Sequence, residues 1–321
     1  MKTPAFWYKP PGLLSTLLAP LSLLYAAGRW LDETIHFTHY FAQPVICIGN
    51  AVAGGAGKTP TTLALVDLLQ AEGVVPHIVT RGYGGIECGP RRVKPDDTAT
   101  QVGDETLLLA AAAPTWVAQD RKLGIGCALS ASAPLVLLDD GLQNTKVRAL
   151  LNFLVVDGAS GFGNGQLLPA GPLREFPTLL RRRVQALVMI GEDKHKIAAY
   201  FPSCPVFGAS VQPDLDNLDI NQPYAAFAGL ARPEKFFKTG VEAGLQIVDE
   251  KSFADHHPYS EADRKDLMEW AAKNNAQLLT TTKDAQRWPP SERHVLKVLP
   301  IQLIFDRPQQ VRQYIKDKLN V

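Results

Sequence analysis

The chain has 321 residues, of which 46% are hydrophobic, so it can bury a full core and is long for a single domain. Its 33 Lys and Arg residues nearly balance 32 Asp and Glu residues, and the formal net charge of +1 gives no electrostatic reason to expect nucleic acid as a partner. The four cysteines lie far apart without a C-x-x-C pair or a metal-ligand spacing, which is typical of reduced thiols in a cytosolic protein.

The first predicted element is an apolar run, GLLSTLLAPLSLLYAAG at residues 12–28, with Lys2 and Lys9 before it and Arg29 after it. A signal peptide fits the charge pattern, but the motifs that follow indicate a protein that stays in the cytosol. A membrane-spanning helix needs roughly 20 apolar residues, whereas this run is shorter and contains Pro20. We favour an anchor that lies in the membrane interface, and a helix packed on the domain is the alternative. The aromatic residues at the ends of the segment are Phe6, Trp7, Tyr8 and Trp30.

The next element, VICIGNAVAGGAGKTPTT at residues 45–62, has the strand, glycine-rich loop and helix start of a phosphate-binding loop. In such a loop the glycines let backbone N–H groups turn toward the phosphates, the lysine reaches the β and γ oxygens, and the Ser or Thr hydroxyl binds magnesium. Val52 stands where the pattern G-x-x-x-x-G-K-[ST] has its first glycine, so we expect the entrance of the loop to be built differently, with a turn at Gly49 and Asn50. The predicted ATP-binding residues are Val52, Ala53, Gly54, Gly55, Ala56, Gly57, Lys58 and Thr59.

Short β-branched or apolar runs alternate with helical stretches between about residues 45 and 190, which predicts a parallel sheet with helices on both faces. The runs are VICIG, VPHIVT, APTWVA, PLVLLDD, NFLVVDG and ALVMIG. Ligands of such sheets bind beyond the carboxyl ends of the strands, where GNAVAGGAGKT, TRGYGG, QDR and DDG all fall. The predicted fold class is therefore an α/β, P-loop NTPase-like parallel sheet, with a smaller C-terminal α/β domain and an apolar N-terminal helix.

The run LVLLDDGLQN is an apolar strand that ends in Asp139 and Asp140, the arrangement of a Walker B element. A carboxylate at such a strand tip reaches Mg²⁺ directly or through water. Together with the glycine-rich loop, it predicts a Mg-nucleotide site, and the sequence leaves open which of the two aspartates contacts the metal. Gln143 and Arg121 are weaker candidates for positioning the ligands.

Groups that could activate a nucleophile occur in two places. QVGDETLLLA puts Asp104 and Glu105 at a glycine-marked helix start, where a capping role is equally consistent with the pattern. SFADHHPYS places His256 and His257 beside Asp255 in a loop, a pattern that is suggestive of function but weak.

A second group of candidates follows an irregular glycine- and proline-rich stretch, GFGNGQLLPAGPLRE, which is well suited to wrap a ligand. Arg174 could neutralise charge on a transferred phosphoryl group, and Glu175 is a candidate magnesium ligand. The residues Arg181, Arg182 and Arg183 fit a solvated face or a contact with acidic lipid headgroups equally well.

A shift in composition between residues 201 and 222, rich in proline, Asp and Asn, predicts a domain boundary. We expect an N-terminal segment at 1–35, a nucleotide-binding domain at 36–208 and a smaller α/β domain at 209–321. The last unit should contain a helix from Glu261 to Asn274, opened by a Ser260 cap, and strands near LLTTT and VLKVLP.

Eight motifs in one order resemble the tetraacyldisaccharide 4'-kinase family of lipid A biosynthesis over nearly the whole chain. They are GNAVAGGAGKTP, TRGYGG, VGDE, LLDDGLQN, NGQLLPAGPLRE, FAGLARPEKFF, FADHHPYS and LLTTTKDAQR. In that family the missing first glycine is normal, which accounts for Val52. Phe176 departs from the family pattern, which usually has proline there.

The resemblance implies transfer of the γ-phosphate of ATP to the 4'-hydroxyl of a tetraacylated glucosamine disaccharide 1-phosphate, at the cytosolic face of the bacterial inner membrane. It gives the role of proton acceptor to Asp104, assisted by His256, and we expect closure of the domains to bring the two together. Lys58 and Arg174 would stabilise the phosphoryl group. Magnesium would lie near Thr59, Asp139 or Asp140, and Glu175, and no protein partner is expected to be required.

Two other classes of protein compete with this assignment. A nucleotide-switched membrane protein, like the partitioning ATPases, would use a similar loop and a membrane-seeking helix but would not need the pair Asp104 and His256. An ATP-dependent ligase would release ADP and free phosphate together with a new amide or ester bond.

Overall fold

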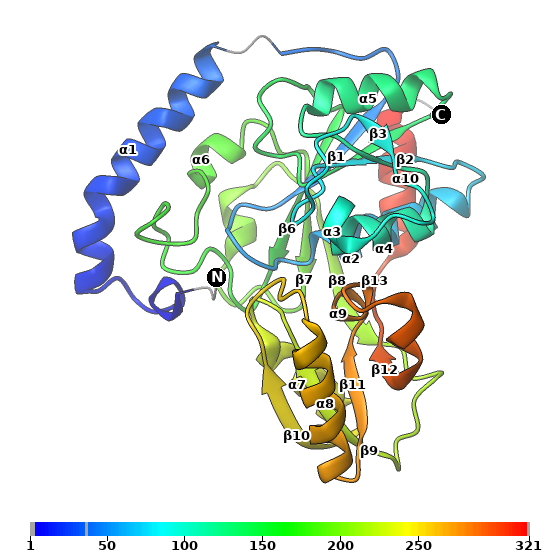
Figure 1. Cartoon of the computed structure of the whole chain (residues 1–321). Coiled ribbons are helices and arrows are strands. Elements are labelled where there is room, and N and C mark those ends of the chain that lie inside the picture. Colours follow the sequence, from blue (N-terminus) through cyan, green and yellow to red (C-terminus); the bar gives the residue numbers. More distant parts are fainter. Residues whose placement is uncertain (1–3, 36–37, 320–321) are drawn as a thin grey trace.

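The computed structural model of the chain describes residues 4–35 and 38–319 and contains two sheets (Figure 1). The larger has nine strands in the order β13-β8-β7-β6-β1-β5-β2-β4-β3. All neighbours in it are parallel except the two edge pairs, β13 with β8 and β3 with β4, which are antiparallel. Its strands are β1 (Val45–Gly49), β2 (His77–Thr80), β3 (Arg91–Arg92), β4 (Thr115–Val117), β5 (Val136–Asp139), β6 (Leu151–Asp157), β7 (Ala186–Ile190), β8 (Val206–Pro213) and β13 (Ile301–Phe305).

The smaller sheet has four parallel strands in the order β10-β9-β11-β12. These are β9 (Pro223–Ala228), β10 (Gln246–Ser252), β11 (Gln277–Thr281) and β12 (Leu296–Leu299). The helices of the chain are α1 (Leu13–Ile35), α2 (Lys58–Gln70), α3 (Ala99–Val102), α4 (Asp104–Ala112), α5 (Arg121–Ser130), α6 (Pro177–Leu180), α7 (Pro233–Glu242), α8 (Glu261–Lys273), α9 (Thr282–Gln286) and α10 (Pro308–Leu319). Short 3-10 helices are η1 (Ala5–Tyr8), η2 (Ile197–Tyr200) and η3 (Pro290–Val295).

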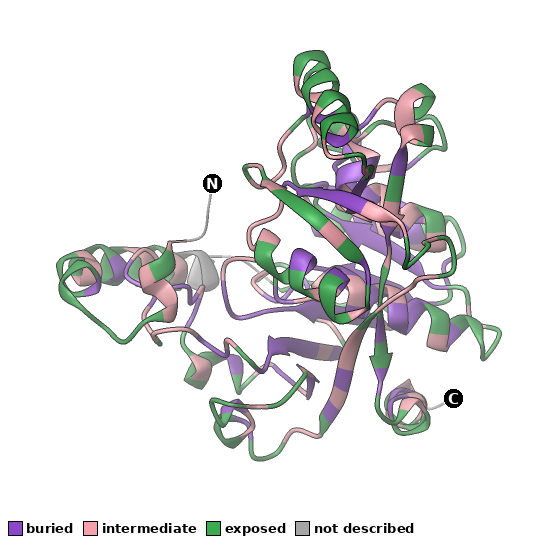
Figure 2. Ribbon diagram, turned by 90° about the horizontal axis from the view of Figure 1, so that it is seen from below, coloured by how far each residue is buried: buried purple, intermediate pink, exposed green. Residues whose placement is uncertain are grey.

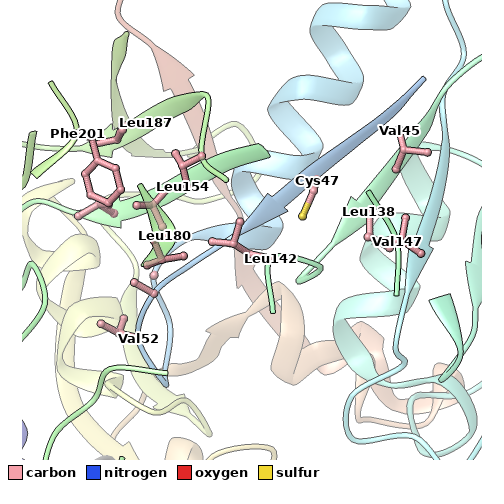
Figure 3. Packing of buried hydrophobic residues seen from close by; sticks show 14 of the residues in the cluster. Val45, Cys47, Val52, Leu138, Leu142, Val147, Leu154, Leu180, Leu187 and Phe201 are labelled. Atoms are coloured by element: carbon pink, nitrogen blue, oxygen red, sulfur yellow. The ribbon is translucent and has the colours of Figure 1, made fainter. Parts of the chain in front are cut away.

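The central strands of the larger sheet are buried on both faces, as their continuous apolar sequences predict. Alternate residues of β1 show this directly: Val45 and Cys47 belong to one core cluster, and Ile46 and Ile48 belong to another on the opposite face. The first cluster reaches Val52 in the glycine-rich loop (Figure 3). These findings confirm the predicted α/β fold with helices on both faces of a mostly parallel sheet.

Helix α1 stands at one side of the molecule and shows the reverse of the pattern of an ordinary surface helix (Figures 1 and 2). Its serines, Ser15 and Ser22, are buried, with exposed fractions of 3% and 6%. The Ser22 hydroxyl donates to the Leu167 carbonyl at 2.9 Å. Most leucines of α1 are exposed instead, and the exposed large apolar side chains are Leu13, Leu14, Leu17, Leu21, Leu23, Leu24, Trp30 and Leu31. Within residues 4–35 and 38–319, no helix is both long enough and apolar enough to cross a bilayer.

The larger sheet contains strands from both sides of the boundary that we predicted at residue 209. That boundary falls inside β8, because part of the stretch expected to be a linker, Val206–Pro213, forms a strand of the larger sheet. The chain then builds the smaller sheet and returns, so that β13 pairs with β8 and α10 packs on the larger sheet's core. An edge strand such as β8 leaves backbone groups unpaired, and β13 satisfies them. The parts of the predicted domains at 1–3, 36–37 and 320–321 lie outside the described residues.

The expected elements of the last part of the chain are present. Helix α8 begins after Ser260, whose hydroxyl accepts from the backbone N–H of Asp263, while the Asp263 carboxylate reaches back to Ser260 in a capping box. The strands expected near LLTTT and VLKVLP are β11 and β12.

Candidate active site

The glycine-rich loop connects β1 to α2, and its entrance is an extended segment rather than a glycine turn. Val52 forms an antiparallel bridge with Leu173, and the Ala53 N–H donates to the Pro172 carbonyl at 2.7 Å. The left-handed backbone is carried farther along, by Gly54 (φ 115°) and by Gly57 (φ 88°) at the N-terminus of α2. A valine fits the first position because this backbone is extended there.

Asn50 organises the loop from inside. Its buried side-chain amide donates to the carbonyls of Val52 at 2.8 Å and Gly54 at 3.3 Å. Its side-chain oxygen lies 3.4 Å from the Lys58 amine. The expected turn therefore depends on Asn50, whereas Gly49 is the last residue of β1.

Lys58, Asp140 and Arg174 form a charged cluster where β5 ends beside the loop. Lys58 Nζ lies 3.7 Å from Asp140 Oδ1, and Arg174 Nη1 lies 3.0 Å from the same oxygen. Burial by itself would raise the pKa of Asp140, but the charges of Lys58 and Arg174 outweigh it and lower that pKa. Three of the predicted phosphate-site residues, from three separate motifs, are thus in contact.

Asp139, the other aspartate of the pair, is buried and accepts from the Thr62 hydroxyl at 2.9 Å. Burial, followed by the negative charges of Glu105 and Asp140, raises the pKa of Asp139 to about 6. A carboxyl group with this pKa is partly protonated just below neutral pH, and a positive charge placed beside it would stabilise its ionised form.

Glu105 contacts the phosphate loop directly, in addition to lying in the first turn of α4. It accepts from the Thr59 hydroxyl at 2.6 Å through one carboxylate oxygen and pairs with Lys283 Nζ at 2.5 Å through the other. Burial would raise the pKa of Glu105, but the charge and hydrogen bond of Lys283 lower it. Glu105 is therefore an ionised link between the loop and the segment that follows β11.

Asp104 and His256 are in contact, with His256 Nδ1 at 3.2 Å from Asp104 Oδ2. Asp104 is the first residue of α4, after Gly103, and His256 lies in the loop after β10. We expected a closure of the domains to bring these two residues together, but the structure already holds them as a pair. The side chain of Asp104 is only 2% exposed and that of His256 is 24% exposed.

Arg287, at the end of α9, is a third member of this group that the sequence reasoning missed. Its guanidinium forms an ion pair with Asp104 and another with Asp284 at 2.8 Å, and it donates to the Gly229 carbonyl at 3.0 Å. Asp284 is itself fixed by donors from Gly229 and Tyr259 at 2.9 and 2.8 Å. The arginine was present in the motif LLTTTKDAQR, but no local pattern links it to Asp104.

Electrostatics keep Asp104 ionised. Burial would raise its pKa, but the hydrogen bond from His256 and the charge of Arg287 together hold that pKa well below the usual range of an aspartate. The hydrogen bond to Asp104 correspondingly raises the pKa of His256, against the effect of burial. The contact therefore favours the ionised carboxylate of Asp104 and the protonated form of His256.

The raised pKa of His256 predicts a pH-dependent contribution to stability. The folded protein binds this proton more tightly than the unfolded chain, so the contribution is complete below pH 6.5, the ordinary histidine pKa, and declines as pH rises through the raised pKa. We expect the difference in urea unfolding free energy between wild type and His256→Gln to be larger near about pH 6 than near about pH 9. A difference that stays constant or grows with pH would contradict this assignment.

The remaining predicted residues lie at the rim of the cluster. Gln143 donates to the Asn50 carbonyl at 2.8 Å and accepts from Arg174 at 3.1 Å. Arg121 donates to the backbone carbonyl of Asp140 at 3.3 Å. Glu175 is buried, and it pairs with Arg183 and accepts from Gln143 at 3.3 Å.

Two further predicted features lie away from the phosphate loop or are exposed. His257 pairs with Asp263 at 3.1 Å, which is the acid of the α8 capping box, so its contacts differ from those of His256. Arg181 and Arg182 are exposed.

A groove of about 1490 Å³ opens beside Asp104, His256 and Arg287, and it runs between residues 91–115 and 256–293.

The donors needed for a divalent cation are present but do not form a preassembled protein site. In the described parts of the chain, no three His, Cys, Asp or Glu side chains gather closely enough to hold a metal ion. The Thr59 hydroxyl and the carboxylates of Glu105, Asp139 and Asp140 are oxygen donors of the kind that Mg²⁺ prefers. Such a set fits a magnesium ion that is held jointly with nucleotide phosphates.

Comparisons with known proteins agree with this site. Residues 14–320 match the family model LpxK, described as Tetraacyldisaccharide-1-P 4'-kinase. The chain is 44% identical over 314 residues to the Tetraacyldisaccharide 4'-kinase of Paramagnetospirillum magneticum, with 96% of each chain covered. It is 43% identical over 330 residues to the protein of the same name from Rhodospirillum centenum, covering 100% of this chain and 97% of the relative.

A solved structure is similar over the same extent. The crystal structure of LpxK from Aquifex aeolicus in complex with ATP superposes with a TM-score of 0.77 at 26% identity, covering 96% of this chain and 100% of the other. The phosphate loop, the aspartates at the end of β5 and the Asp104–His256 pair thus occur in a chain that matches one family over nearly its whole length. The chain belongs to the tetraacyldisaccharide-1-P 4'-kinase family.

Proposed function

We propose that this chain transfers the γ-phosphate of ATP to the 4'-hydroxyl of a tetraacylated glucosamine disaccharide 1-phosphate, forming lipid IVA in lipid A biosynthesis. The observation that carries the proposal is the adjacency of Asp104 and Glu105 at the start of α4. Glu105 bonds to Thr59 of the phosphate loop, while Asp104 bonds to His256. A hydroxyl that hydrogen-bonds to Asp104 therefore lies next to the position expected for the terminal phosphate.

Asp104 is the proton acceptor for the sugar hydroxyl in this proposal. The low pKa of Asp104 keeps it ionised at neutral pH, so that it can orient the hydroxyl and accept its proton as the bond to phosphorus forms. His256 and Arg287 hold the carboxylate in place, as positioning residues. A switch protein that only hydrolyses ATP would not need this arrangement around a buried aspartate.

The phosphate site binds and neutralises the transferred group. Lys58 and Arg174, both in contact with Asp140, would interact with the phosphoryl oxygens as negative charge redistributes among them. The residues from Val52 to Thr59 would supply backbone amides to the phosphates, at the N-terminus of α2.

Magnesium would be held by Thr59 and by Asp139 or Asp140, and it would screen the charge on the phosphates. Glu175, the third predicted ligand, would have to exchange its contact with Arg183 for the metal. The raised pKa of Asp139 supports a cation beside it, because a positive charge would stabilise its ionised form.

The enzyme would act at the cytoplasmic face of the inner membrane, where ATP is available and where a substrate with four acyl chains resides. The support is α1, most of whose leucines are exposed while Ser22, on its other side, donates to the Leu167 carbonyl of the protein. An exposed apolar face of this size is the kind of surface that inserts into the boundary between headgroups and acyl chains.

We expect the double substitution Leu17→Glu with Leu24→Glu to weaken binding to anionic phospholipid vesicles by about tenfold or more, because each leucine would lose burial worth about 1.5 kcal/mol or more. The two side chains are 66% and 70% exposed, so the protein fold should be unaffected. Co-sedimentation with vesicles measures the effect. The matched control is Val241→Glu with Val248→Glu, which are 55% and 50% exposed on the smaller sheet's side. Equal binding by both double variants would refute the role of α1.

One assay tests the proposed reaction. The purified chain is incubated with ATP labelled on the γ-phosphate, magnesium and detergent-dispersed disaccharide 1-phosphate, and the lipids are separated by thin-layer chromatography. Label is expected in the lipid product. Label found only as free phosphate would overturn the assignment in favour of a hydrolase or a ligase.

A further inference from the structure

Arg232, at the N-terminus of α7, contacts the phosphate loop from the smaller sheet's side. Its Nη2 donates to the Gly55 carbonyl at 2.9 Å and to Asp157 Oδ2, also at 2.9 Å. The two acceptors are 177 and 75 residues away in sequence. A single guanidinium nitrogen therefore joins the loop, the end of β6 and the start of α7.

The contact with the Gly55 carbonyl has a consequence for the amide that follows it. The peptide unit is planar and trans, so its C=O and its N–H point in opposite directions. Arg232 fixes the direction of the Gly55 carbonyl and thereby fixes that of the Ala56 N–H. Asn50 does the same for the preceding unit, because it binds the Gly54 carbonyl and so sets the Gly55 N–H. The orientations of the Gly55 and Ala56 N–H groups are thus set by two side chains, Asn50 and Arg232, from different parts of the fold.

Arg232 is itself restrained on two sides. Asp157, only 8% exposed, pairs with both Arg232 and Lys235. The guanidinium carbon lies 5.4 Å from the centre of the Tyr8 ring, within the range of a cation–π contact. Tyr8 is the last residue of η1, just before the exposed helix α1. The segment next to the proposed membrane anchor therefore contacts the residue that contacts the loop.

The segment η1 is also fixed to the strip that borders the loop entrance. The Trp7 indole donates to the Pro169 carbonyl at 3.0 Å, and the Asn164 N–H donates to the Trp7 carbonyl at 2.7 Å. The same strip continues to Leu173, which bridges Val52. Tyr8 is thus presented to Arg232 by a segment with its own contacts.

We propose that Arg232 is a positioning residue for the phosphate loop: it orients the Ala56 amide for a phosphate oxygen, and Tyr8 and Asp157 hold it in place. The inference rests on the proposed function only in taking this loop to be the ATP site. It adds that the smaller sheet's part of the chain takes part in phosphate binding through α7, and that η1 contributes through Tyr8.

The test compares Arg232→Met, at the N-cap of α7, with Lys235→Met, in the first turn of the same helix. Both remove an ion pair with Asp157, but only the first removes the contact with the Gly55 carbonyl. We expect Arg232→Met to raise the Kd of Mg·ATP, measured by calorimetry, about ten- to hundredfold, and Lys235→Met to leave it within about threefold of wild type. An unchanged Kd for Arg232→Met, or equal losses for the two variants, would overturn the proposal.

A phosphate-only probe separates an effect on the loop from an effect on the nucleoside. Magnesium tripolyphosphate, measured by competition with ATP, should lose affinity for Arg232→Met by a factor similar to that for ATP. If its affinity stayed at the wild-type value, Arg232 would be a nucleoside contact, and the positioning role would be wrong.

Substitutions of Tyr8 give a second test that does not alter Arg232. Tyr8→Leu should raise the Kd of Mg·ATP about threefold or more, whereas Tyr8→Phe, which keeps the aromatic ring, should leave the Kd near the wild-type value. In the Arg232→Met background, Tyr8→Leu should cause no further rise in the Kd. Additive effects of the two substitutions would contradict the link. Failure of the wild type to label the lipid would overturn the proposed reaction alone, because these binding measurements require no lipid substrate.

Discussion

Replacing Asp104 by asparagine is expected to lower kcat for transfer of phosphate to the lipid by about 10²- to 10⁴-fold, the usual contribution of a positioned proton acceptor. An asparagine has nearly the same shape, so it can occupy the same space beside His256 and Arg287. Its amide cannot accept the proton of the sugar hydroxyl. The measurement is the rate of appearance of labelled lipid at saturating ATP.

Calorimetry with Mg·ATP controls for the integrity of the Asp104→Asn variant. The affinity should stay near the wild-type value, because Asp104 contacts His256 and Arg287 rather than the loop. Asp266→Asn, a change of the same kind at an exposed position on α8, should leave the rate of labelling unchanged. Labelling by Asp104→Asn at close to the wild-type rate would remove Asp104 from the chemistry.

Replacing Lys58 by alanine is expected to lower kcat/KM by about 10²- to 10³-fold or more, as does the loss of one preorganised electrostatic group in other enzymes. Lys58 is also the cation that contacts Asp140 and lowers its pKa, and its charge partly offsets the rise in the pKa of Asp139. The loss of Lys58 therefore removes a side chain that would bind phosphate, and it also removes a positive charge that balances the negative charges of Asp139 and Asp140. Labelled lipid and Mg·ATP binding would both decline.

The control for Lys58→Ala is Lys265→Ala, whose side chain is 75% exposed and pairs with Glu269 on α8. This variant should label lipid at the wild-type rate. Undiminished labelling by Lys58→Ala itself would show that the loop is not the site of the transferred phosphate.

Several features of the site could be predicted from local sequence because they depend on short-range chemistry. The glycines lie in one loop, Lys58 and Thr59 begin the helix that follows it, and Asp139 and Asp140 stand at the end of an apolar strand. Parallel strands bring their carboxyl ends to one edge, so convergence of these motifs followed from the alternation of strands and helices.

Other features had no signal in the local pattern. Glu105 looked like a helix cap, yet it bonds to Thr59 and to Lys283, which is 178 residues away. Arg287 reaches Asp104 over 183 residues, and Arg232 reaches Gly55 over 177. Periodicity and composition describe how a residue sits in its own element and carry no information on contacts at this range.

The sequence by itself determined the phosphate-loop chemistry, the strand and helix pattern and, through its motifs, the family. The tertiary structure alone decided that Val52 is accommodated by pairing with Leu173, that β13 returns to the edge of the larger sheet and that Arg287 and Lys283 face Asp104 and Glu105. The physical reason is that the periodicity and caps of single strands and helices are specified by neighbouring residues. The pairing of distant strands and the ion pairs of α4 with Lys283 and Arg287 depend on how separately formed elements pack together.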